Sequence, residues 1–413
     1  MSRRSSYGYS SYRSGSYGGY GGYRRNRRGD DGKKKAIIIA VIVLVVLAAA
    51  VGVCAYLGVF SGKNEKTSES SSEVSQTSVQ QSESTKVSET SENSEKSQQE
   101  SKIQQSSAPV KEIKGEFDGN VFIYDKQGYE IFYGTDDSAK KYTDVVSSIK
   151  NSLGKDVKVY NMIVPTHGYY ALPDNYKKLG NDEKSNVTTA YKSYGSDIVT
   201  IDVFSALEQH KDEYIYFKTD HNWTGLGAYY AYTEFCKSAG VTPIDVKTLS
   251  TGEIKNFLGS LSAATRTEQS TKGNKVLAAN PDFVKYYKIP GSYTCTLLEN
   301  GKSEPEDVPL IATFAEGSNA YSAFIWGNNP YMHIKTSLKT GRKLCIIKDS
   351  YGCAFAPFTV SNFDEVYIVD PTFYEGNVLD YIKKNKYTDV LVLNSIMNAN
   401  TQIRVDEIKT ILK

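Results

Sequence analysis

The stretch VKVYNMIVP, residues 157–165, is almost continuously apolar and is interrupted only at Lys158 and Asn161. A strand that is apolar on both faces is typical of the centre of a parallel sheet, where helices cover both sides. Residues 142–153 precede it with apolar side chains at helical spacing, and Gly154 ends that run. A helix followed by a buried strand is typical of the α/β class.

The same pattern continues on both sides of this stretch. It predicts a hairpin of strands 121–124 and 130–133 about a turn at 126–128, helices at 186–194, 203–210 and 227–239, and strands at 196–202, 214–217, 343–347, 365–370 and 390–394. Residues 282–330 alternate apolar residues with turns, which predicts a β-rich insertion that shapes a substrate groove. We therefore expect a three-layer α/β/α domain over residues 111–413, with a mostly parallel sheet.

The first 110 residues have three different compositions. Residues 1–35 are rich in Tyr, Gly, Ser and Arg, with ten Arg and Lys against two Asp, and they predict a disordered tail of net charge +8. Residues 36–60 contain no charged residue and are long enough to cross a bilayer as one transmembrane helix. Residues 61–110 are almost wholly polar, which predicts a disordered linker that acts as a spacer.

The charge of the tail sets the expected orientation of the membrane helix. By the positive-inside rule the N-terminus is cytoplasmic and the C-terminal domain is extracellular, which predicts a single-pass protein of the cell membrane. A cleaved signal peptide with a processing site at residues 48–50 is the alternative. The whole chain carries +2, so the residues after the tail carry −6, and we expect no nucleic acid on the folded domain. The tail itself favours anionic lipid head groups, with RNA binding as the alternative.

Four cysteines follow the apolar segment, and none has the spacing of a metal site. They are Cys236, Cys295, Cys345 and Cys353. Two of them lie in a predicted apolar strand and a predicted amphipathic helix, where a buried free thiol is as natural as a disulfide. The sequence has no Walker loop and no dinucleotide fingerprint. We therefore expect no disulfide framework, no metal and no cofactor.

Two short motifs carry groups that are typical of nucleophilic catalysis. Residues 219–224, TDHNWT, place Asp220 beside His221 in a loop before a predicted helix. Residues 347–352, IKDSYG, place Ser350 where a predicted strand turns. An imidazole that is held by a carboxylate can take the proton of a serine hydroxyl. The alternatives are a helix-capping role for Ser350 and a structural role for His221.

Other residues in and near these motifs, Asn222 among them, are candidates for contacts to an oxyanion or a substrate. The backbone amides after Ser350, including that of Gly352, can stabilise an oxyanion if the turn directs them inward. Asn394 and Asn398 follow the last predicted strand and are further donors, with exposed loop asparagines as the alternative. Trp223 can stack on a sugar ring, although packing in the core also explains a tryptophan.

Together with GAY at residues 227–229, the two motifs resemble the bacterial DHHW family, which is related to the SGNH-hydrolase-like domains of alginate O-acetyltransferases. The resemblance covers most of residues 115–413. It implies an SGNH-hydrolase-like fold and an extracytoplasmic Ser-His-Asp enzyme that places acetyl groups on polysaccharide hydroxyls. In such an enzyme Ser350 is the nucleophile and Asp220 orients the base. The implied partners are an extracellular or cell-wall glycan and a polytopic membrane protein that exports acyl groups.

The sequence departs from these relatives at the base. In the alginate enzymes the catalytic histidine directly precedes Trp, but here Asn222 does, and His221 fills the earlier position. An asparagine amide does not accept a proton near neutral pH. Three alternatives follow: His221 acts as the base, His167 supplies the imidazole from a neighbouring strand end, or the site is inactive and the protein is a glycan-binding or cell-envelope scaffold.

Overall fold

The structure is a computed structural model that describes residues 114–413. The expected tail (1–35), membrane helix (36–60) and linker (61–110) lie outside the described residues and stay predictions. Within residues 114–413, no helix combines the length and the apolar composition needed to cross a bilayer.

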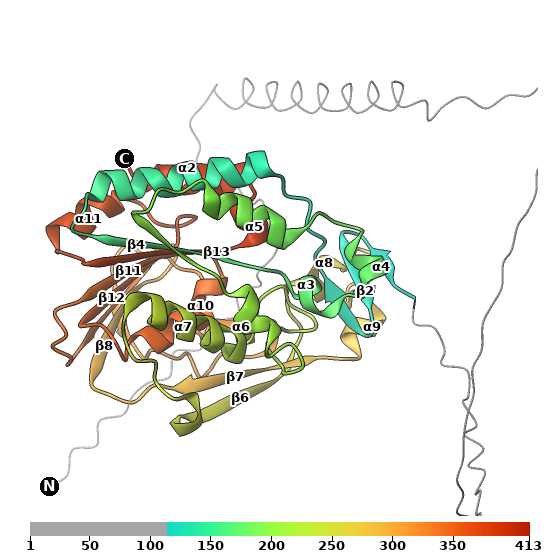
Figure 1. Cartoon of the computed structure of the whole chain (residues 1–413). Helices are drawn as coiled ribbons and strands as arrows, with labels where there is room; N and C mark the ends of the chain where they lie inside the picture. Colours follow the sequence, from blue (N-terminus) through green and yellow to red (C-terminus); the bar gives the residue numbers. More distant parts are fainter. Residues whose placement is uncertain (1–113) are drawn as a thin grey trace, which may run out of the picture. The chain divides into compact units, whose positions relative to one another are not determined.

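An eight-stranded sheet forms the centre of the described domain (Figure 1). Its order is β5 (Ile198–Ile201), β4 (Lys158–Val164), β13 (Asp389–Ser395), β11 (Lys343–Lys348), β12 (Glu365–Val369), β10 (Tyr331–Thr336), β8 (Tyr293–Leu298) and β9 (Glu306–Val308). The first five strands are parallel, and the last three join them antiparallel. The predicted α/β class is confirmed, but the sheet is mixed rather than mostly parallel.

The central strands are among the most apolar stretches of the described chain. Every residue of β13 is buried, and β11 and β4 are buried beyond their first residues. Successive side chains of a strand point to opposite faces. In β4, Tyr160 and Met162 join one hydrophobic cluster, whereas Val159 and Ile163 join the other. This burial on both sides is the reason that residues 157–165 are apolar on both faces.

Helices cover both faces of the sheet, so the three expected layers are present. The helices concerned are α2 (Asp136–Leu153), α5 (Glu183–Lys192), α11 (Val378–Lys384) and α13 (Gln402–Thr410) on one face, and α6 (Phe204–Glu208), α7 (Gly225–Ala239) and α10 (Tyr351–Thr359) on the other. Figure 1 shows α2, α5 and α11 above the sheet and α6, α7 and α10 below it. α2 begins earlier than the predicted helix at 142–153 because the Thr135 hydroxyl caps it by accepting from Ser138 N.

The N-terminal hairpin differs from the prediction in the position of its turn. β1 (Glu116–Asp118), β2 (Val121–Tyr124) and β3 (Gln127–Tyr129) form a small antiparallel sheet. Asp125 and Lys126 form the turn with φ of 42° and 66°, which are left-handed values typical of a two-residue hairpin turn. The second strand therefore begins at Gln127, and Glu130 follows its end instead of starting it.

The predicted strand at 214–217 does not join the sheet. Tyr216 forms an isolated bridge with Trp223, and Thr224 N donates to the carbonyl of Ile215, so the chain doubles back before α7. The edge of the main sheet is formed by β5, so no strand is added there by residues 214–217. Their apolar side chains pack instead in the hydrophobic cluster beneath the sheet. The residues between the two halves of this loop, 218–222, therefore lie at its tip.

Residues 282–330, the predicted β-rich insertion, contribute strands to two different sheets. β8 and β9 extend the sheet beyond β10, while β7 (Asp282–Lys288) pairs with β6 (Ser250–Phe257). The 3-10 helix η2 (Gly317–Ala323) approaches the serine motif, since Tyr321 OH donates to the carbonyl of Ser350. Short helices complete the described domain: α3 (His167–Ala171), α4 (Asp174–Lys177), η1 (Val246–Thr248), α8 (Ser260–Ala264), α9 (Lys275–Ala278) and α12 (Ile396–Ala399).

Candidate active site

Ser350 lies between the end of β11 and the start of α10, at the carboxyl edge of the parallel strands. This edge is where open α/β sheets bind ligands. The Ser350 hydroxyl caps no amide of α10, so the structure does not favour the helix-capping alternative. The turn is sharp because residue 352 is glycine: a Cβ there would lie 2.4 Å from Cβ of Lys348. The Ser350 side chain stays partly exposed.

His221 is the imidazole that the structure brings to Ser350. Its Nε2 lies 3.3 Å from Oγ of Ser350, although the two residues are 129 positions apart in the chain. Its Nδ1 lies 2.6 Å from Oγ of Ser260, the first residue of α8. The carbonyl of His221 accepts a hydrogen bond from Tyr351 OH, which holds the loop against α10. Both ring nitrogens thus face a serine hydroxyl.

Asp220 has different partners from those expected, because no hydrogen bond joins it to the imidazole of His221. Its Oδ1 accepts from the backbone and side-chain amides of Asn222 at 2.9 and 2.7 Å, and its Oδ2 accepts from Ser260 N at 2.7 Å. An aspartate that binds the amide two residues ahead closes a tight turn, and its carboxylate is then directed away from the next side chain. Among the described residues, hydrogen bonds connect the Asp220 carboxylate to the imidazole of His221 only through Ser260.

Asn222 connects Asp220 to Ser350. Its Nδ2 donates to Asp220, and its Oδ1 accepts a hydrogen bond of 2.8 Å from the Ser350 hydroxyl. The side chain is 3% exposed, and its orientation is set because a carboxylate can only accept. Asn222 therefore lies between carboxylate and serine, where a Ser-His-Asp site has its imidazole.

His167 lies in a different environment. Its ring stacks on Tyr216 and contacts Tyr129, with centroid distances of 5.2 and 5.1 Å. Burial lowers the pKa of His167 to about 4, and a backbone hydrogen bond with Phe217 offsets only part of this effect. No hydrogen bond joins His167 to Ser350 within residues 114–413. The structure thus brings His221, and not His167, to the serine.

Two of the expected substrate contacts are part of the core. Trp223 is fully buried, and its Nε1 donates to the carbonyl of Tyr351 at 2.9 Å. Asn394 is 1% exposed, and its Nδ2 donates to Tyr142 OH at 3.0 Å. Both side chains are engaged within the protein and hidden from solvent, so neither can contact a glycan in this arrangement.

The amides after Ser350 are also engaged, which corrects the expected oxyanion role of Gly352. Gly352 N donates to the carbonyl of Asp349, and Tyr351 N donates to the Asp349 carboxylate, both at 3.0 Å. Asn398 donates to the same carboxylate at 2.8 Å. The amide of Ser350 itself has no partner in the described part of the chain. It is therefore the amide beside the nucleophile that is free to face an oxyanion.

Three carboxylates act on the imidazole of His221. Burial lowers the pKa of His221, but Asp220, Glu130 and Asp349 raise it, and the result lies above the ordinary 6.5. For the Glu130 carboxyl the effect of burial has the opposite sign: burial raises its pKa, and the nearby His221 offsets part of this rise. The imidazolium that forms when His221 accepts a proton is therefore stabilised by nearby negative charge.

Ser260 and Glu130 are the residues of the site that the sequence did not single out. Both lie outside the two motifs. Ser260 follows Gly259, where a Cβ would lie 2.3 Å from Cβ of Asp220, so only glycine lets α8 approach the motif. A Gly-Ser pair before a short helix is a common helix start, and it carries no catalytic signal.

A buried ion pair supports the serine turn from below. Lys348 Nζ lies 3.1 Å from Oδ2 of Asp370, and it also donates to Asn328 at 2.9 Å and to the Cys353 thiol at 3.3 Å. Burial lowers the pKa of Lys348, but the neighbouring Asp370 outweighs it and the amine stays charged. Cys353 is a buried free thiol, as are Cys236, Cys295 and Cys345.

The comparisons with known proteins agree with the resemblance carried by the two motifs. The family model described as DHHW protein matches residues 64–369. This chain belongs to the DHHW family. A DHHW family protein from Eubacterium siraeum is 32% identical, with a TM-score of 0.64 over 71% of this chain and 96% of that one. No curated protein matches the sequence.

Two solved structures of Bacillus cereus PatB1 share the fold of this DHHW protein. PatB1 is 17% identical, with a TM-score of 0.56 over 71% of this chain and 99% of that one. PatB1 with a sulfonyl adduct is 16% identical, with a TM-score of 0.57 over 70% of this chain and 99% of that one.

Among the described residues, no group of three or more His, Cys, Asp or Glu side chains is arranged to hold a metal ion.

Proposed function

We propose that this DHHW protein is a cell-surface O-acyltransferase or O-acetylesterase that acts on an extracellular or cell-wall polysaccharide. The observation that carries the proposal is the 3.3 Å separation of Ser350 Oγ and His221 Nε2 at the carboxyl edge of the sheet. A serine beside an imidazole whose other nitrogen is held is the arrangement that acyl transfer requires.

The proposed reaction begins at the Ser350 hydroxyl. Its oxygen attacks the carbonyl carbon of an acyl ester while His221 Nε2 takes the hydroxyl proton. The free amide of Ser350 stabilises the tetrahedral oxyanion. When this intermediate collapses, the bond to the leaving alcohol breaks, and the alcohol takes the proton from His221. An acyl group then remains on Ser350.

In the second half of the reaction, a glycan hydroxyl or a water gives its proton to His221 and attacks the acyl carbon. The bond to Ser350 breaks, and the serine recovers its proton. Ser260 has a defined part in this cycle, because its hydroxyl lies at Nδ1 of His221 and accepts the N–H that keeps Nε2 free. Asp220 acts one step further away, by holding the Ser260 amide.

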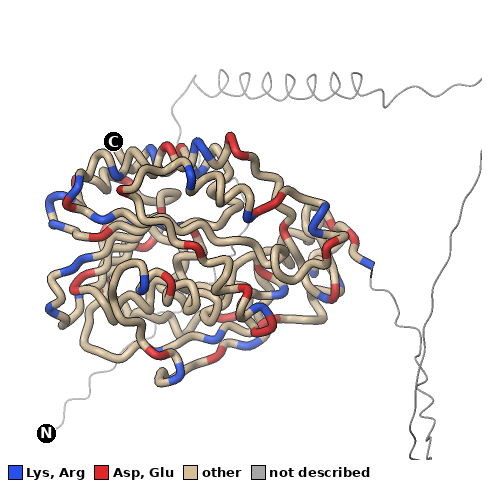
Figure 2. Tube along the Cα trace, viewed as in Figure 1, with Lys and Arg blue, Asp and Glu red and all other residues tan. Residues whose placement is uncertain are grey.

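The proposed setting is the outer face of a cell membrane. An anchor at residues 36–60 and a linker at 61–110 would present the domain to a surface glycan, and an acyl donor would come from a polytopic membrane partner. Figure 2 shows basic and acidic residues interspersed over the described domain. Recognition of a glycan would then depend on a local site and not on the charge of one whole face.

A labelling experiment tests the nucleophile. One similar structure is PatB1 with a sulfonyl adduct, and a sulfonyl fluoride is a suitable probe here because a reactive serine oxygen displaces its fluoride. We expect the purified full chain to gain the mass of one sulfonyl group. The variants Ser350→Ala and His221→Ala should gain none while they keep the wild-type circular dichroism. Wild-type protein that is folded and unlabelled would count against an activated serine.

A non-catalytic glycan-binding or envelope scaffold protein is the second candidate. The observation that favours it is the bond from Ser350 to Asn222, 2.8 Å long against 3.3 Å to His221. In this arrangement the serine proton is directed to an amide oxygen that cannot keep it. Binding of polysaccharide without any ester turnover would support this candidate over the enzyme.

A further inference from the structure

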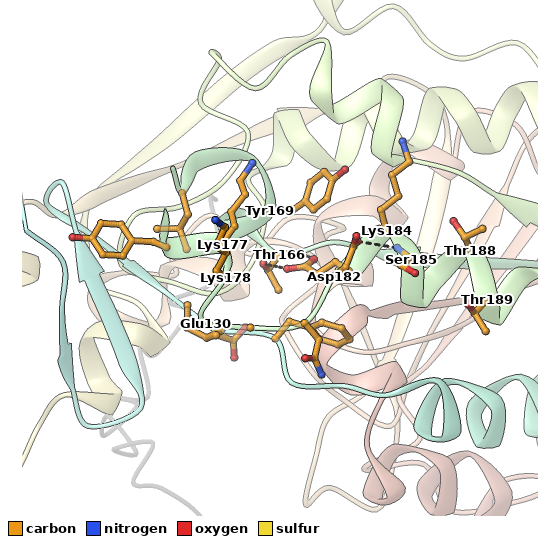
Figure 3. Close-up of a pocket in the computed structure, with 18 of the residues that line it drawn as sticks. Glu130, Thr166, Tyr169, Lys177, Lys178, Asp182, Lys184, Ser185, Thr188 and Thr189 are labelled. Carbon is orange, nitrogen blue, oxygen red and sulfur yellow. Dashed lines mark hydrogen bonds between the residues drawn. The ribbon is translucent and has the colours of Figure 1, made fainter. Parts of the chain in front are cut away.

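A cavity of about 630 Å³ lies at the carboxyl end of β4, and Glu130 and Thr166 are among the residues that line it. It is bounded by the segment after β3, the end of β4, and helices α3, α4 and α5. Figure 3 shows Lys184, Thr188 and Thr189 along α5 on one side, and Glu130, Thr166, Tyr169, Lys177 and Lys178 on the other. The cavity has the size of sites that hold small ligands.

The topology places this cavity at the same edge of the sheet as Ser350. β4 and β11 are both parallel to β13, which lies between them, and the residue pairs place Lys348, the last residue of β11, level with Met162, two residues before the end of β4. Thr166 follows β4 as Ser350 follows β11. Two strand spacings separate the strands, about 10 Å, so one extended ligand can contact both.

Glu130 lies where the cavity meets the active site. It lines the cavity, and its charge acts on His221, Asp220 and Asp349. Its carboxylate has no hydrogen-bond or ion-pair partner within residues 114–413, although the side chain is partly buried. A partly buried carboxylate without a protein partner is free to accept hydrogen bonds from a ligand.

Two further carboxylates line the cavity, and both already accept hydrogen bonds from the protein. Asp182 Oδ1 accepts from Ser185 N at 2.9 Å. Oε1 and Oε2 of Glu183 accept from Oγ1 and N of Thr166, at 2.6 and 2.8 Å. These bonds fix the chain at the end of β4 and leave Glu130 as the free acceptor. Tyr169 adds an aromatic ring, and Thr188 and Thr189 add exposed hydroxyls. Lys177, Lys178, Lys184 and Lys192 also line the cavity, so it presents hydrogen-bond donors as well as acceptors. Donors, acceptors and an aromatic ring together suit a ligand with many hydroxyl groups.

We propose that this cavity binds the glycan whose hydroxyl group reaches Ser350, with the Glu130 carboxylate accepting hydrogen bonds from the sugar hydroxyls. The inference rests on the proposed function and adds its acceptor site. A carboxylate at this position holds the sugar beside His221, so Glu130 selects ligands that donate hydrogen bonds.

The test is glycan binding by the purified full chain in mild detergent. The probes are chitotetraose, cellotetraose and tetragalacturonate, titrated by calorimetry. Glu130→Gln removes the charge and keeps the shape, and Thr188→Trp fills the cavity from the exposed face of α5. Glu253→Gln is the matched control, because Glu253 lies exposed on β6 without a hydrogen-bond partner in the described part of the chain.

We expect at least one probe to bind the wild-type protein and the Glu253→Gln control equally well. Glu130→Gln should weaken that binding at least tenfold, and Thr188→Trp should abolish it. The proposal is overturned if no probe binds, or if both cavity variants bind like the wild type. Sulfonyl labelling of the same wild-type sample separates the two ideas. Binding that depends on Glu130 without labelling of Ser350 keeps the cavity site and removes the enzyme, and labelling without such binding does the reverse.

Discussion

The Ser350 hydroxyl donates a hydrogen bond of 2.8 Å to the side-chain oxygen of Asn222. Asn222 is bound in turn to the carboxylate of Asp220, so the three residues form a continuous chain from nucleophile to carboxylate. The residue in the middle has the length to reach both neighbours but lacks a basic nitrogen. Proton transfer from Ser350 therefore requires its hydroxyl to turn from Asn222 to His221.

The first prediction concerns a histidine at this middle position. Asn222→His places an imidazole within reach of both Asp220 and Ser350, so we expect ester turnover that no longer depends on His221. His221→Ala alone should lose roughly 10²- to 10⁴-fold in kcat/KM, which is the usual contribution of a general base. The double variant Asn222→His, His221→Ala should recover most of this loss. The measurement is hydrolysis of p-nitrophenyl acetate.

The matched control for this experiment is Asn222→Ala with His221→Ala, which removes the amide without adding a base. It should stay as inactive as His221→Ala alone. Equal activity of the two double variants would show that position 222 does not communicate with Ser350, contrary to the geometry of the Asp220, Asn222 and Ser350 chain.

The second prediction concerns Ser260 as a positioning residue. Ser260→Ala removes the hydroxyl 2.6 Å from Nδ1 of His221, so the ring loses the contact that fixes its tautomer and orientation. We expect kcat to fall roughly tenfold to a hundredfold, as for other small misplacements of a reacting group. KM should change little, because Ser260 does not contact the substrate. Ser260→Thr, which keeps the hydroxyl, should restore most of the activity.

A loss of stability alone would lower the amount of folded enzyme and leave the kcat of the folded fraction unchanged. Active-site titration with the sulfonyl fluoride measures that fraction. If Ser260→Ala lowers only the titratable fraction, Ser260 does not position the imidazole.

The third prediction follows from the charges around His221. A general base works in its neutral form, so kcat/KM should rise with pH through the pKa of His221, which Asp220, Glu130 and Asp349 raise above 6.5. Glu130→Gln removes one of these negative charges and should move the acidic limb to lower pH. Glu253→Gln should leave it in place. An upward shift in Glu130→Gln would contradict the assignment of His221 as base.

The sequence was sufficient for the central strands because burial on both faces leaves a clear pattern. Residues 157–165 are apolar except for Lys158 and Asn161, residues 390–393 are wholly apolar, and these stretches form most of β4 and β13. Residues 214–217 are equally apolar but pack under the sheet in a loop. A short apolar run predicts that a segment is buried, but it does not predict whether the segment pairs with a strand of the sheet.

The candidate site also has residues that the sequence predicted and contacts that it did not. Ser350 and His221 come from recognisable motifs, and the structure brings them together. The contact of His221 with Ser260 depends on how α8 packs, 39 residues away, and no local pattern encodes it. The motif places Asp220 beside His221, but adjacent residues in a tight turn direct their side chains differently, so Asp220 binds Asn222 and Ser260 instead of the imidazole. No pattern in the sequence around Glu130 indicates that its carboxylate lacks a partner.

The last prediction concerns the ion pair beneath the serine turn. Lys348→Ala leaves Asp370 buried, with the more distant Arg404 Nη1 at 3.7 Å as its remaining cation. Removing one partner of a buried pair typically lowers the free energy of unfolding by about 3 to 5 kcal/mol. We expect a loss of this size in urea denaturation. Sulfonyl labelling of Ser350 should also slow, because the turn rests on Lys348.

Lys343 provides the control, because it begins the same strand and also forms an ion pair. Its Nζ lies 2.7 Å from Glu365, but both side chains are partly exposed, at 30% and 22%. Exposed and half-exposed pairs contribute about 0 to 1 kcal/mol because water solvates the charges. Lys343→Ala should therefore cost little and leave labelling unchanged. If the two variants lose equal stability, Lys348 is not held in a desolvated pair, and the support of the Ser350 turn must come from the packing of α10 alone.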